Sequence, residues 1–487
     1  MNAPLAFLIF SLGIAVLFYL DRDKSVQTSK GLWLPVIWIW IAGSRAVSAW
    51  FPAGSESAGN LAATLDGSPM DAVIFEGLII AGLIVLYRRK NRAMTLLKAS
   101  GPVLIYFLYC LVSTAWSPIH GPAFKRWIKD FGDLVMVLLI VTETQPIEAL
   151  RRLYSRVGFI LLPFSIPLIK YTSLGCSYDE YGPTNTGVTT NKNTLGLIVF
   201  VVSLGALWNM RALLTDKKAR YRTRRLVAQG TLLISGIVLL QMAHCATAIA
   251  CFVLGSGLML ATNLRTIGNR PGRVHALCLG IILVGGVTML FGGESIVTSA
   301  LGRNSDLTGR TDIWKASIAA ADSPVFGTGF ESFWNTNVEK VALGLPGFWG
   351  PTVHNLVSAH NGYIEVYLDL GWVGLCLIVL IMVTGYRHAI KFFRRDPQSA
   401  SLILAYIATS AFYSITEVGF RVLTPSWIFL LLAVVSASGF SAGLIFTKQS
   451  GVATLRIRTA SSTSAMNEEI LESCDEPLLA SPRQIFQ

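Results

Sequence analysis

The sequence predicts an all-α polytopic integral membrane protein, with about 12 to 13 transmembrane helices and one long, partly helical loop on the outer side. Three observations carry this prediction. Of the 487 residues, 53% are hydrophobic and 14% are charged, whereas soluble proteins carry about 25% charged residues. The apolar residues fall into runs of about 17 to 23 residues, the length of a helix that spans a bilayer. Basic residues cluster in the short segments between these runs, a pattern that orients membrane helices.

The candidate spans number thirteen. In chain order they lie at residues 5–20, 32–50, 71–87, 100–116, 132–147, 157–174, 194–210, 226–243, 246–263, 275–292, 361–383, 400–417 and 426–446. The first run is short, and it has neither a basic segment before it nor a small-residue cleavage site after it. We therefore expect it to be a retained helix and not a cleaved signal peptide.

The distribution of lysine and arginine predicts how these spans are oriented. Of the 40 basic residues, 29 lie after odd-numbered spans, 10 lie in the opposite segments and Arg45 lies within a span. Because segments rich in lysine and arginine stay in the cytoplasm, the N-terminus is expected outside and the C-terminus inside. This pattern also accounts for the net charge of +12, so we expect no nucleic-acid partner.

This topology divides the chain into four parts. We expect N-terminal transmembrane helices over 1–292, an outward-facing loop or lid over 293–360, C-terminal transmembrane helices over 361–446 and a disordered cytoplasmic tail over 447–487. The tail is rich in serine, threonine and acidic residues, which cannot bury a core. The cytoplasmic segments contain neither a P-loop nor a G-x-G-x-x-G motif, which argues against an ATP-driven pump in one chain. None of the seven cysteines forms a C-x-x-C pair, so neither a zinc site nor a disulfide framework is indicated.

The predicted lid is much longer than a connection between two spans needs to be, and loops of that size are functional or disordered. Its composition favours a folded structure, because it holds many aromatic side chains: Trp314, Trp334, Trp349, Phe326, Phe330, Phe333 and Phe348. Thr311 is expected to cap a short helix that continues through Ala321, with Pro324 beyond its end. The aromatic residues can either anchor the lid at lipid headgroups or stack on sugar rings.

Several basic side chains on the outer side are candidates for binding an anion. Arg303 and Arg310 lie in the lid, and two arginine forks that face one site can hold a pyrophosphate; the alternative is a solvated pair on a loop. Lys192 precedes a span and is flanked by Asn, Thr and Gly, which leaves its charge for an anionic ligand. Arg126 can bind a phosphate or a lipid headgroup. Arg421 follows Glu417 by four residues, a spacing that predicts a salt bridge at a helix end.

Histidine supplies the candidate general base. His354 and His360 close the lid, and His360 stands where the chain re-enters the membrane. Asn361, Glu365 and Asp369 follow at helical spacing and share one face. Glu365 lies one turn below His360 and can orient its imidazole, which suits histidine to acid–base work. The alternative is that both histidines only cap or solvate the start of the helix.

Together these residues describe a cationic site with one candidate base, at the outer membrane surface under an aromatic lid. Such a site suits a lipid-linked phosphate or pyrophosphate donor and a hydroxyl acceptor, because arginine and lysine stabilise the charge of a departing phosphate. The sequence shows no metal-ligand set, so we expect no metal and no cofactor.

Two stretches around these residues resemble the signature of the O-antigen ligase and Wzy-type polysaccharide polymerase superfamily. In GRTDIWKASIAAADSPVFGTGFESFW an arginine precedes a tryptophan-containing helix and a P-x-x-G-x-G turn. In AHNGYIEVYLDLGWVGL, His-Asn opens a helix that contains G-x-x-G. GVTTNKNTLG is similar to the family's shorter motif before an earlier span, and its Lys-Asn form most resembles rhizobial exopolysaccharide polymerases of the succinoglycan type.

The resemblance implies a metal-independent glycosyltransferase of the bacterial inner membrane, with its active site facing the periplasm. Members of the family take a glycan from undecaprenyl diphosphate and pass it to a sugar hydroxyl, without a nucleotide sugar. By motif, His360 would be the base or would position the acceptor, with Asn361 and Glu365 in support, and Arg310 would bind diphosphate. Lys192 stands near where ligases place an arginine, so Lys192, Arg303 and Arg126 remain open as the second diphosphate ligand.

Three functions are consistent with these features. The first is a polymerase that joins exopolysaccharide repeat units, with membrane lipids and the flippase, chain-length and export proteins of its pathway as partners. The second is an O-antigen ligase that passes the glycan to lipid A-core. The third is a flippase or transporter of a lipid-linked glycan, favoured by acidic residues within spans: Glu76, Glu365 and Asp369.

Overall fold

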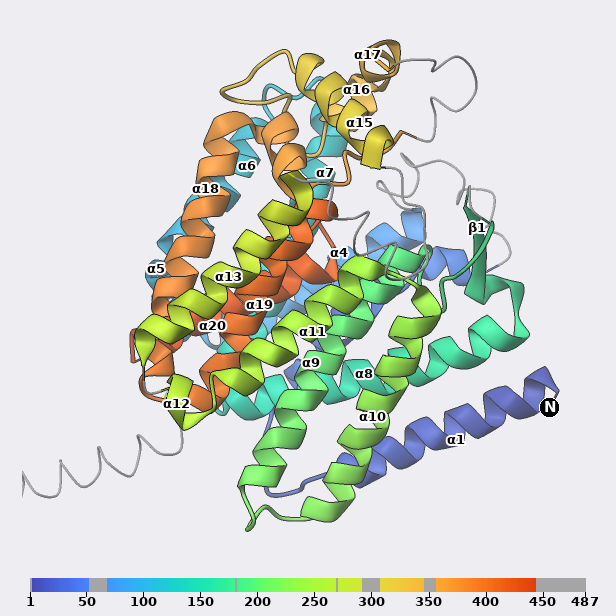
Figure 1. Ribbon diagram of the computed structural model, residues 1–487, viewed down its shortest axis with the longest axis vertical. Helices are drawn as coiled ribbons and strands as arrows, with labels where there is room; N and C mark the ends of the chain where they lie inside the picture. The colour runs from blue at the N-terminus through green and yellow to red at the C-terminus, as the bar shows by residue number, and fades with distance from the viewer. Residues whose placement is uncertain are drawn as a thin grey trace, which may run out of the picture. The chain divides into compact units, whose positions relative to one another are not determined.

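The computed structural model describes residues 2–51, 68–179, 182–268, 270–290, 307–345 and 356–443. Residues Met1–Leu444 form one compact unit, and within it the described chain is almost entirely helical, which confirms the predicted all-α fold (Figure 1). The elements are α1 (Ala3–Asp21), η1 (Lys30–Leu32), α2 (Trp33–Ala42), η2 (Val47–Trp50), α4 (Pro69–Tyr87), α5 (Lys90–Ala99), α6 (Gly101–Ser113), α7 (His120–Val141), α8 (Pro146–Tyr171), η4 (Ser173–Gly175), β1 (Cys176–Asp179), β2 (Gly182–Asn185), α9 (Lys192–Thr215), α10 (Arg222–Ala243), α11 (Ala246–Ala261), α12 (Arg265–Gly268), α13 (Pro271–Leu290), α15 (Leu307–Ala319), α16 (Phe333–Thr336), α17 (Val338–Leu343), α18 (Gly362–Phe393), α19 (Pro397–Thr416) and α20 (Pro425–Ser441).

Each predicted span coincides with an apolar helix, but the helices differ in length. Among the described residues, 7 helices are long and apolar enough to cross a membrane alone, and the pair α5–α6, bent by 91°, makes up to 8. The helices η1–α2, α11 and α20 are apolar but shorter, and so is the stretch Gly272–Val284 of α13. Some of the 12 to 13 predicted spans therefore form helices shorter than a full crossing usually needs. The apolar runs are interrupted at Gly43, where α2 ends, and at Ser100, between α5 and α6. In α7, the N-terminal half carries charged residues.

The centre of the bundle is made by helices that are apolar all round. In an apolar stretch of 18 residues, 83% of the residues are buried in α9 and 89% in α19, compared with 11% in α1. In α20, every residue from Pro425 to Phe440 is buried. A helix that is hydrophobic on all sides belongs in such a core. The apolar side chains that α1 exposes, such as Leu8 and Leu12, suit contact with lipid.

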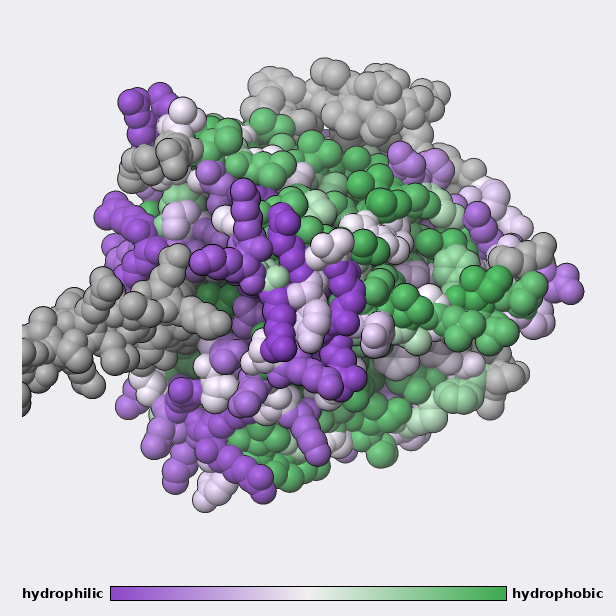
Figure 2. Space-filling view, turned by 90° about the horizontal axis from the view of Figure 1, so that it is seen from below, coloured by the Kyte–Doolittle hydropathy of each residue, from purple (hydrophilic) through white to green (hydrophobic). Residues whose placement is uncertain are grey.

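The predicted basic segments meet at one end of the bundle. Arg152 of α8 donates to the carbonyls of Asp23 and Val26 at 2.7 Å each, and Arg225 of α10 pairs with Asp23 at 3.2 Å. This agrees with the predicted alternation, because these segments follow spans one, five and seven. Figure 2, which views the molecule from below, shows hydrophilic side chains gathered across much of this end and hydrophobic ones beside them.

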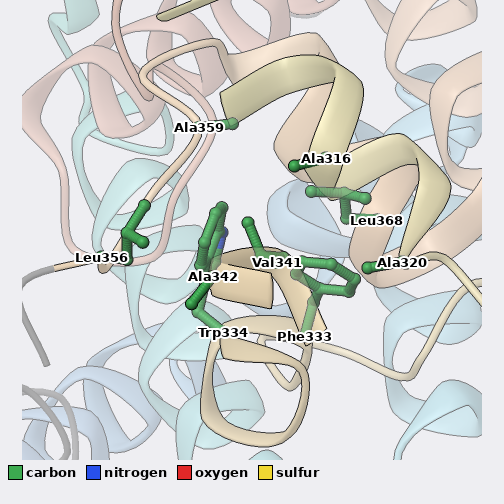
Figure 3. Packing of buried hydrophobic residues seen from close by; sticks show 9 residues of the cluster. All are labelled: Ala316, Ala320, Phe333, Trp334, Val341, Ala342, Leu356, Ala359 and Leu368. Atoms are coloured by element: carbon green, nitrogen blue, oxygen red, sulfur yellow. The ribbon is translucent and has the colours of Figure 1, made fainter. Parts of the chain in front are cut away.

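At the opposite end, the described part of the lid folds over the bundle. Its core joins α15, α16, α17 and the start of α18 through nine buried residues: Ala316, Ala320, Phe333, Trp334, Val341, Ala342, Leu356, Ala359 and Leu368 (Figure 3). The prediction of a helix capped by Thr311 was wrong by about one turn, because α15 already begins at Leu307 and ends at Ala319. One threonine does not fix a helix start when the residues before it tolerate helical geometry, so Arg310 lies in the first turn of α15.

A break in α18 attaches the lid to the membrane helices. Gly371 has φ +64° and ψ −164°, which interrupts the helix. The turn from Pro324 to Gly329 supplies the missing partners: the N–H groups of Trp372 and Val373 donate to the carbonyls of Pro324 and Val325 at 2.9 and 3.2 Å. In return, the carbonyls of Leu368 and Asp369 accept from the N–H groups of Thr328 and Gly329, at 3.1 and 2.8 Å. The P-x-x-G-x-G motif is thus the segment that docks on this break.

We predict that Gly371→Ala destabilises the protein strongly. The left-handed φ costs a residue with a Cβ about 1 to 2 kcal/mol, and that Cβ would also press against the Val325 carbonyl. The midpoint of thermal denaturation of the detergent-purified protein should fall clearly below that of the wild type. Gly77→Ala in α4 is the matched control, because a Cβ there meets nothing within 4 Å. An equal midpoint for Gly371→Ala and the control would contradict the docking described above.

Candidate functional site

One carboxylate collects side chains from three distant segments. Glu417 follows the last residue of α19, and its side chain is 9% exposed. Arg310 of α15 lies 3.8 Å from Glu417 Oε1 through its Nη2, and its Nη1 donates to the Thr416 carbonyl at 2.9 Å. His360 Nδ1 lies 3.6 Å from Glu417 Oε2. Asn193 Nδ2 donates to Glu417 Oε1 at 3.0 Å. The structure thus brings Arg310 and His360 together on one group.

The backbone holds His360 at the edge of this site. Its φ of +49° is left-handed, a conformation in which histidine is enriched among non-glycine residues. Asn361 then caps α18, because its Oδ1 accepts from the N–H groups of Tyr363 and Ile364 at 3.0 and 3.1 Å. The alternative that His360 caps this helix is therefore wrong. The His360 side chain is 41% exposed, which leaves room for an acceptor.

Lys192 belongs to the same neighbourhood. It is the first residue of α9, next to Asn193, and Asn191 caps that helix through the Thr194 N–H at 2.8 Å. Cys245, at the start of α11, lies within electrostatic range of Lys192, Arg310 and Glu417. The motif GVTTNKN therefore places Lys192 next to Asn193, which donates to Glu417.

Arg45, which the sequence left without a role, holds that motif in place. Its guanidinium donates to the carbonyls of Leu174, Gly187 and Thr189 at 2.6, 3.2 and 2.5 Å, and through Nε to Val188 at 3.3 Å. Four carbonyl acceptors compensate a buried guanidinium, so Arg45 fixes the loop that precedes Lys192.

Glu365 supports His360 through the backbone and not through the ring. Its carboxylate accepts from the Ala359 N–H at 2.5 Å and from Trp334 Nε1 at 2.7 Å. In the described structure the His360 ring lies beside Glu417, so the expectation that Glu365 orients the imidazole was wrong. A carboxylate one turn below is drawn instead toward the N–H donors of the lid core, which would otherwise be unpaired.

Arg421 does not form the predicted helix-end pair with Glu417. Because α19 ends at Thr416, the i, i+4 spacing no longer places the two on one helix face. Arg421 instead lies 3.5 Å from both Glu331 of the lid and Glu365 of α18. Burial alone would lower the pKa of Arg421, but the carboxylates of Glu365, Glu331 and Asp369 raise it overall. We call this group of four the Arg421 clamp.

The Arg421 clamp lies beside a small internal cavity of about 20 Å³, which can hold about one water molecule. Asp369 caps α16, because its Oδ1 accepts from the N–H groups of Ser332 and Phe333 at 2.9 Å each. The buried acidic residues predicted on one face of α18 are thus used to attach the lid.

Another predicted residue, Arg126, contacts the lid in the described structure. Arg126 of α7 is buried, and its guanidinium donates to the Glu331 carbonyl and, at 3.5 Å, to Asn335. Arg126 therefore supports the lid, and the structure does not bring it together with Arg310. Arg303 and His354 lie outside the described residues.

The aromatic residues of the lid mostly face inward. Phe330, Phe333 and Trp334 are buried, and Trp314 donates through Nε1 to the Ala359 carbonyl at 2.7 Å, directly before His360. Phe326 is 53% exposed. Trp349 and Phe348 lie outside the described residues. Stacking on sugar rings or contact with headgroups stays a prediction for the exposed rings.

Glu417 is the residue that sequence reasoning missed as a member of the site. A signal was present, because a carboxylate at the end of an apolar span is costly unless it has a partner or a function. Its pairing with Arg421 by sequence spacing concealed that signal, since that pairing requires the helix to continue past the predicted end of the span at residue 417.

Comparison with known proteins shows to which family the stretch that contains Arg310 and His360 is similar. Residues 194–379 match the O-antigen ligase family model (Wzy_C). We call these residues the O-antigen ligase stretch. The O-antigen ligase stretch contains Arg310, His360 and Glu365, while Lys192 lies two residues before it and Glu417 lies 38 residues after it. The exopolysaccharide production protein ExoQ of Rhizobium meliloti (strain 1021) is 27% identical over 311 residues, which cover 62% of this chain and 68% of ExoQ. Both findings confirm the resemblance predicted from the motifs.

We predict that Arg421→Gln loosens the lid. Removing one partner of a buried charge cluster costs about 3 to 5 kcal/mol, here because Glu331 and Glu365 lose their cation. Limited proteolysis should cut the lid of the variant faster than that of the wild type. Arg394→Gln, at an exposed position near the end of α18, is the control and should match the wild type. Equal cleavage rates for Arg421→Gln and wild type would exclude the clamp.

Proposed function

We propose that this protein polymerises exopolysaccharide repeat units on the periplasmic face of the inner membrane. It transfers a glycan from an undecaprenyl-diphosphate-linked donor to a sugar hydroxyl. The observation that carries the proposal is the convergence of Arg310 and His360 on Glu417, from segments that are far apart in the sequence. The O-antigen ligase stretch and the likeness to an exopolysaccharide production protein support the same reaction class.

In this reaction His360 acts as the base. Its imidazole takes the proton from the acceptor hydroxyl, the acceptor oxygen forms a bond to the anomeric carbon, and the bond from that carbon to the diphosphate oxygen breaks. Glu417 beside Nδ1 orients the ring and stabilises the imidazolium that forms, as a carboxylate does in other histidine bases. The proton thus ends on the second ring nitrogen of His360.

The leaving group is an undecaprenyl diphosphate, whose charge increases as the bond breaks. Arg310 supplies a planar fork for its oxygens, and Lys192 supplies a second positive charge. Glu417 holds the Arg310 side chain near the site, at 3.8 Å. This distance is long for a tight ion pair, so a diphosphate can compete for the guanidinium.

The competing functions have weaker support. A flippase was favoured by acidic residues within spans, but Glu365 and Asp369 bind lid groups and Glu76 of α4 is exposed. A ligase remains the second candidate, because the same chemistry serves either acceptor. The likeness to ExoQ favours the polymerase, and with it the flippase, chain-length and export proteins of such a pathway as partners.

Loss of the gene separates the three functions. A polymerase defect should leave single repeat units and no long polymer, a ligase defect should leave long chains on the carrier lipid, and a flippase defect should trap units on the cytoplasmic leaflet.

We predict that His360→Ala and Arg310→Ala abolish long polymer while the protein still inserts in the membrane. Loss of a general base alone costs about 10² to 10⁴ in rate. Glu417→Gln should reduce polymer less severely, because the imidazole remains. Chain-length analysis of secreted polysaccharide, with membrane levels checked by immunoblot, measures this. Lys125→Ala, an exposed lysine of α7 on the same side, is the control. Wild-type chain length from a stably expressed His360→Ala strain would refute the assignment.

We also predict that transfer by the purified protein continues in EDTA and needs no nucleotide. The reason is that Arg310 and Lys192 supply the positive charge that a divalent cation would otherwise provide. The assay is incorporation of labelled repeat unit into polymer. Inhibition by EDTA that is reversed by added Mg²⁺ or Mn²⁺ would contradict this view.

A further inference from the structure

A groove on the outer surface of the lid has no role in the site described above. It lies between α15 and α17 and has a volume of about 460 Å³, within the range of about 300 to 1,000 Å³ that is usual for ligand sites. We call it the α15–α17 groove; it is lined by Lys315, Ala316, Ala319, Ala320, Asp322, Lys340 and Gly344.

The floor of the groove is rigid and made of small residues. Ala316 and Ala320 point into the lid core, where they pack with Phe333, Trp334 and Val341 (Figure 3). Gly344 brings the end of α17 close to α15, because a Cβ there would lie 3.2 Å from that of Ala316. A floor without long side chains lets a flat ring approach the backbone, and packing of the core keeps the groove in shape.

The rim of the groove carries a net positive charge. Lys340 Nζ pairs with Asp322 Oδ2 at 2.6 Å. Lys315 adds a second ammonium, and within the described ranges no carboxylate stands at ion-pair distance from it. The rim therefore offers one positive charge in excess, together with a carboxylate that can accept hydrogen bonds from hydroxyl groups.

The position of the groove relates it to the reaction. Lys315 lies five residues after Arg310 on α15, which is about 7.5 Å along the helix axis. Trp314, the residue before it, is bonded to the backbone next to His360. The groove and the segment that carries His360 are therefore connected through α15.

We propose that the α15–α17 groove binds the growing glycan, and that it selects a glycan with carboxylate groups. Lys315 pairs with such a carboxylate, while the Lys340–Asp322 pair hydrogen-bonds to sugar hydroxyls. Asp322 is 70% exposed and accepts hydrogen bonds, which sugar hydroxyls can donate and the phosphate of a lipid headgroup cannot, so the groove favours an acidic glycan. The role of the ligand as acceptor rests on the proposed function, but its binding does not.

The test is direct binding to the full-length protein in nanodiscs of neutral lipid, by calorimetry. The probes are an oligogalacturonate hexasaccharide, which is acidic, and maltohexaose, which is neutral and has the same number of rings. We expect the acidic probe to bind more tightly. Lys315→Ala should weaken it about fivefold, the size of one exposed ion pair, and Lys315→Arg should restore it. Lys125→Ala is the control lysine and should bind like the wild type.

Two results would overturn the inference. One is equal affinity of wild type and Lys315→Ala for the oligogalacturonate. The other is a Lys315-dependent association with vesicles that contain phosphatidylglycerol but not with the oligosaccharide, which would make the groove a lipid contact. Binding is measured without turnover, so it can fail while polymerisation stands. Lys315-dependent binding in a protein that makes no polymer would instead leave the groove intact and refute the proposed function.

Discussion

The docking of the Pro324–Gly329 turn on the break in α18 constrains the rest of the outer end. Backbone groups freed by a broken helix in a membrane protein are costly unless protein supplies their partners. At Gly371 the lid supplies them, with four backbone hydrogen bonds in a reciprocal pattern. Tyr109 of α6 adds to this by donating to the carbonyls of Phe326 and Leu370 at 3.2 and 2.9 Å. The lid cannot lift away without leaving these groups unpaired, so it acts as part of the bundle.

This constraint sets the geometry of the site. The segment that begins with Arg310 leads directly into the docked turn, and the Arg421 clamp and the Trp334–Glu365 hydrogen bond fix the chain on both sides of His360. Arg310 and His360 therefore approach Glu417 from elements that are already positioned. Such preorganisation places charged groups where charge develops in the reaction, which is the main way in which a protein stabilises a transition state.

Much of the fold followed from the sequence because apolar length and charge distribution are local properties. They gave the helix positions and the alternation of the connecting segments, and the motif gave the place of His360 at the start of α18. Contacts between distant segments were not accessible in the same way. Glu417 and Arg421 are four residues apart, and only the end of α19 at Thr416 shows that they belong to two separate groups.

Contacts between distant segments also explain the other differences between the predicted and the observed site. The role of Arg45 depends on carbonyls about 130 to 145 residues away, and Glu365 binds the Ala359 N–H and not the imidazole because the lid core offers donors that periodicity cannot reveal. A side chain that is a candidate by its charge alone, such as Arg126, can belong either to a catalytic centre or to the structure that supports it. Burial and hydrogen-bond partners separate these cases.

The central claim is that Arg310, Lys192 and His360 surround one diphosphate-binding position next to Glu417. A cryo-electron microscopy map of the protein with an undecaprenyl-diphosphate-linked donor bound tests it most directly. The account predicts diphosphate density within about 3 Å of the Arg310 guanidinium, with the anomeric carbon directed toward His360. Density for the diphosphate on another face of the protein, with the Arg310–Glu417–His360 group undisturbed, would contradict it.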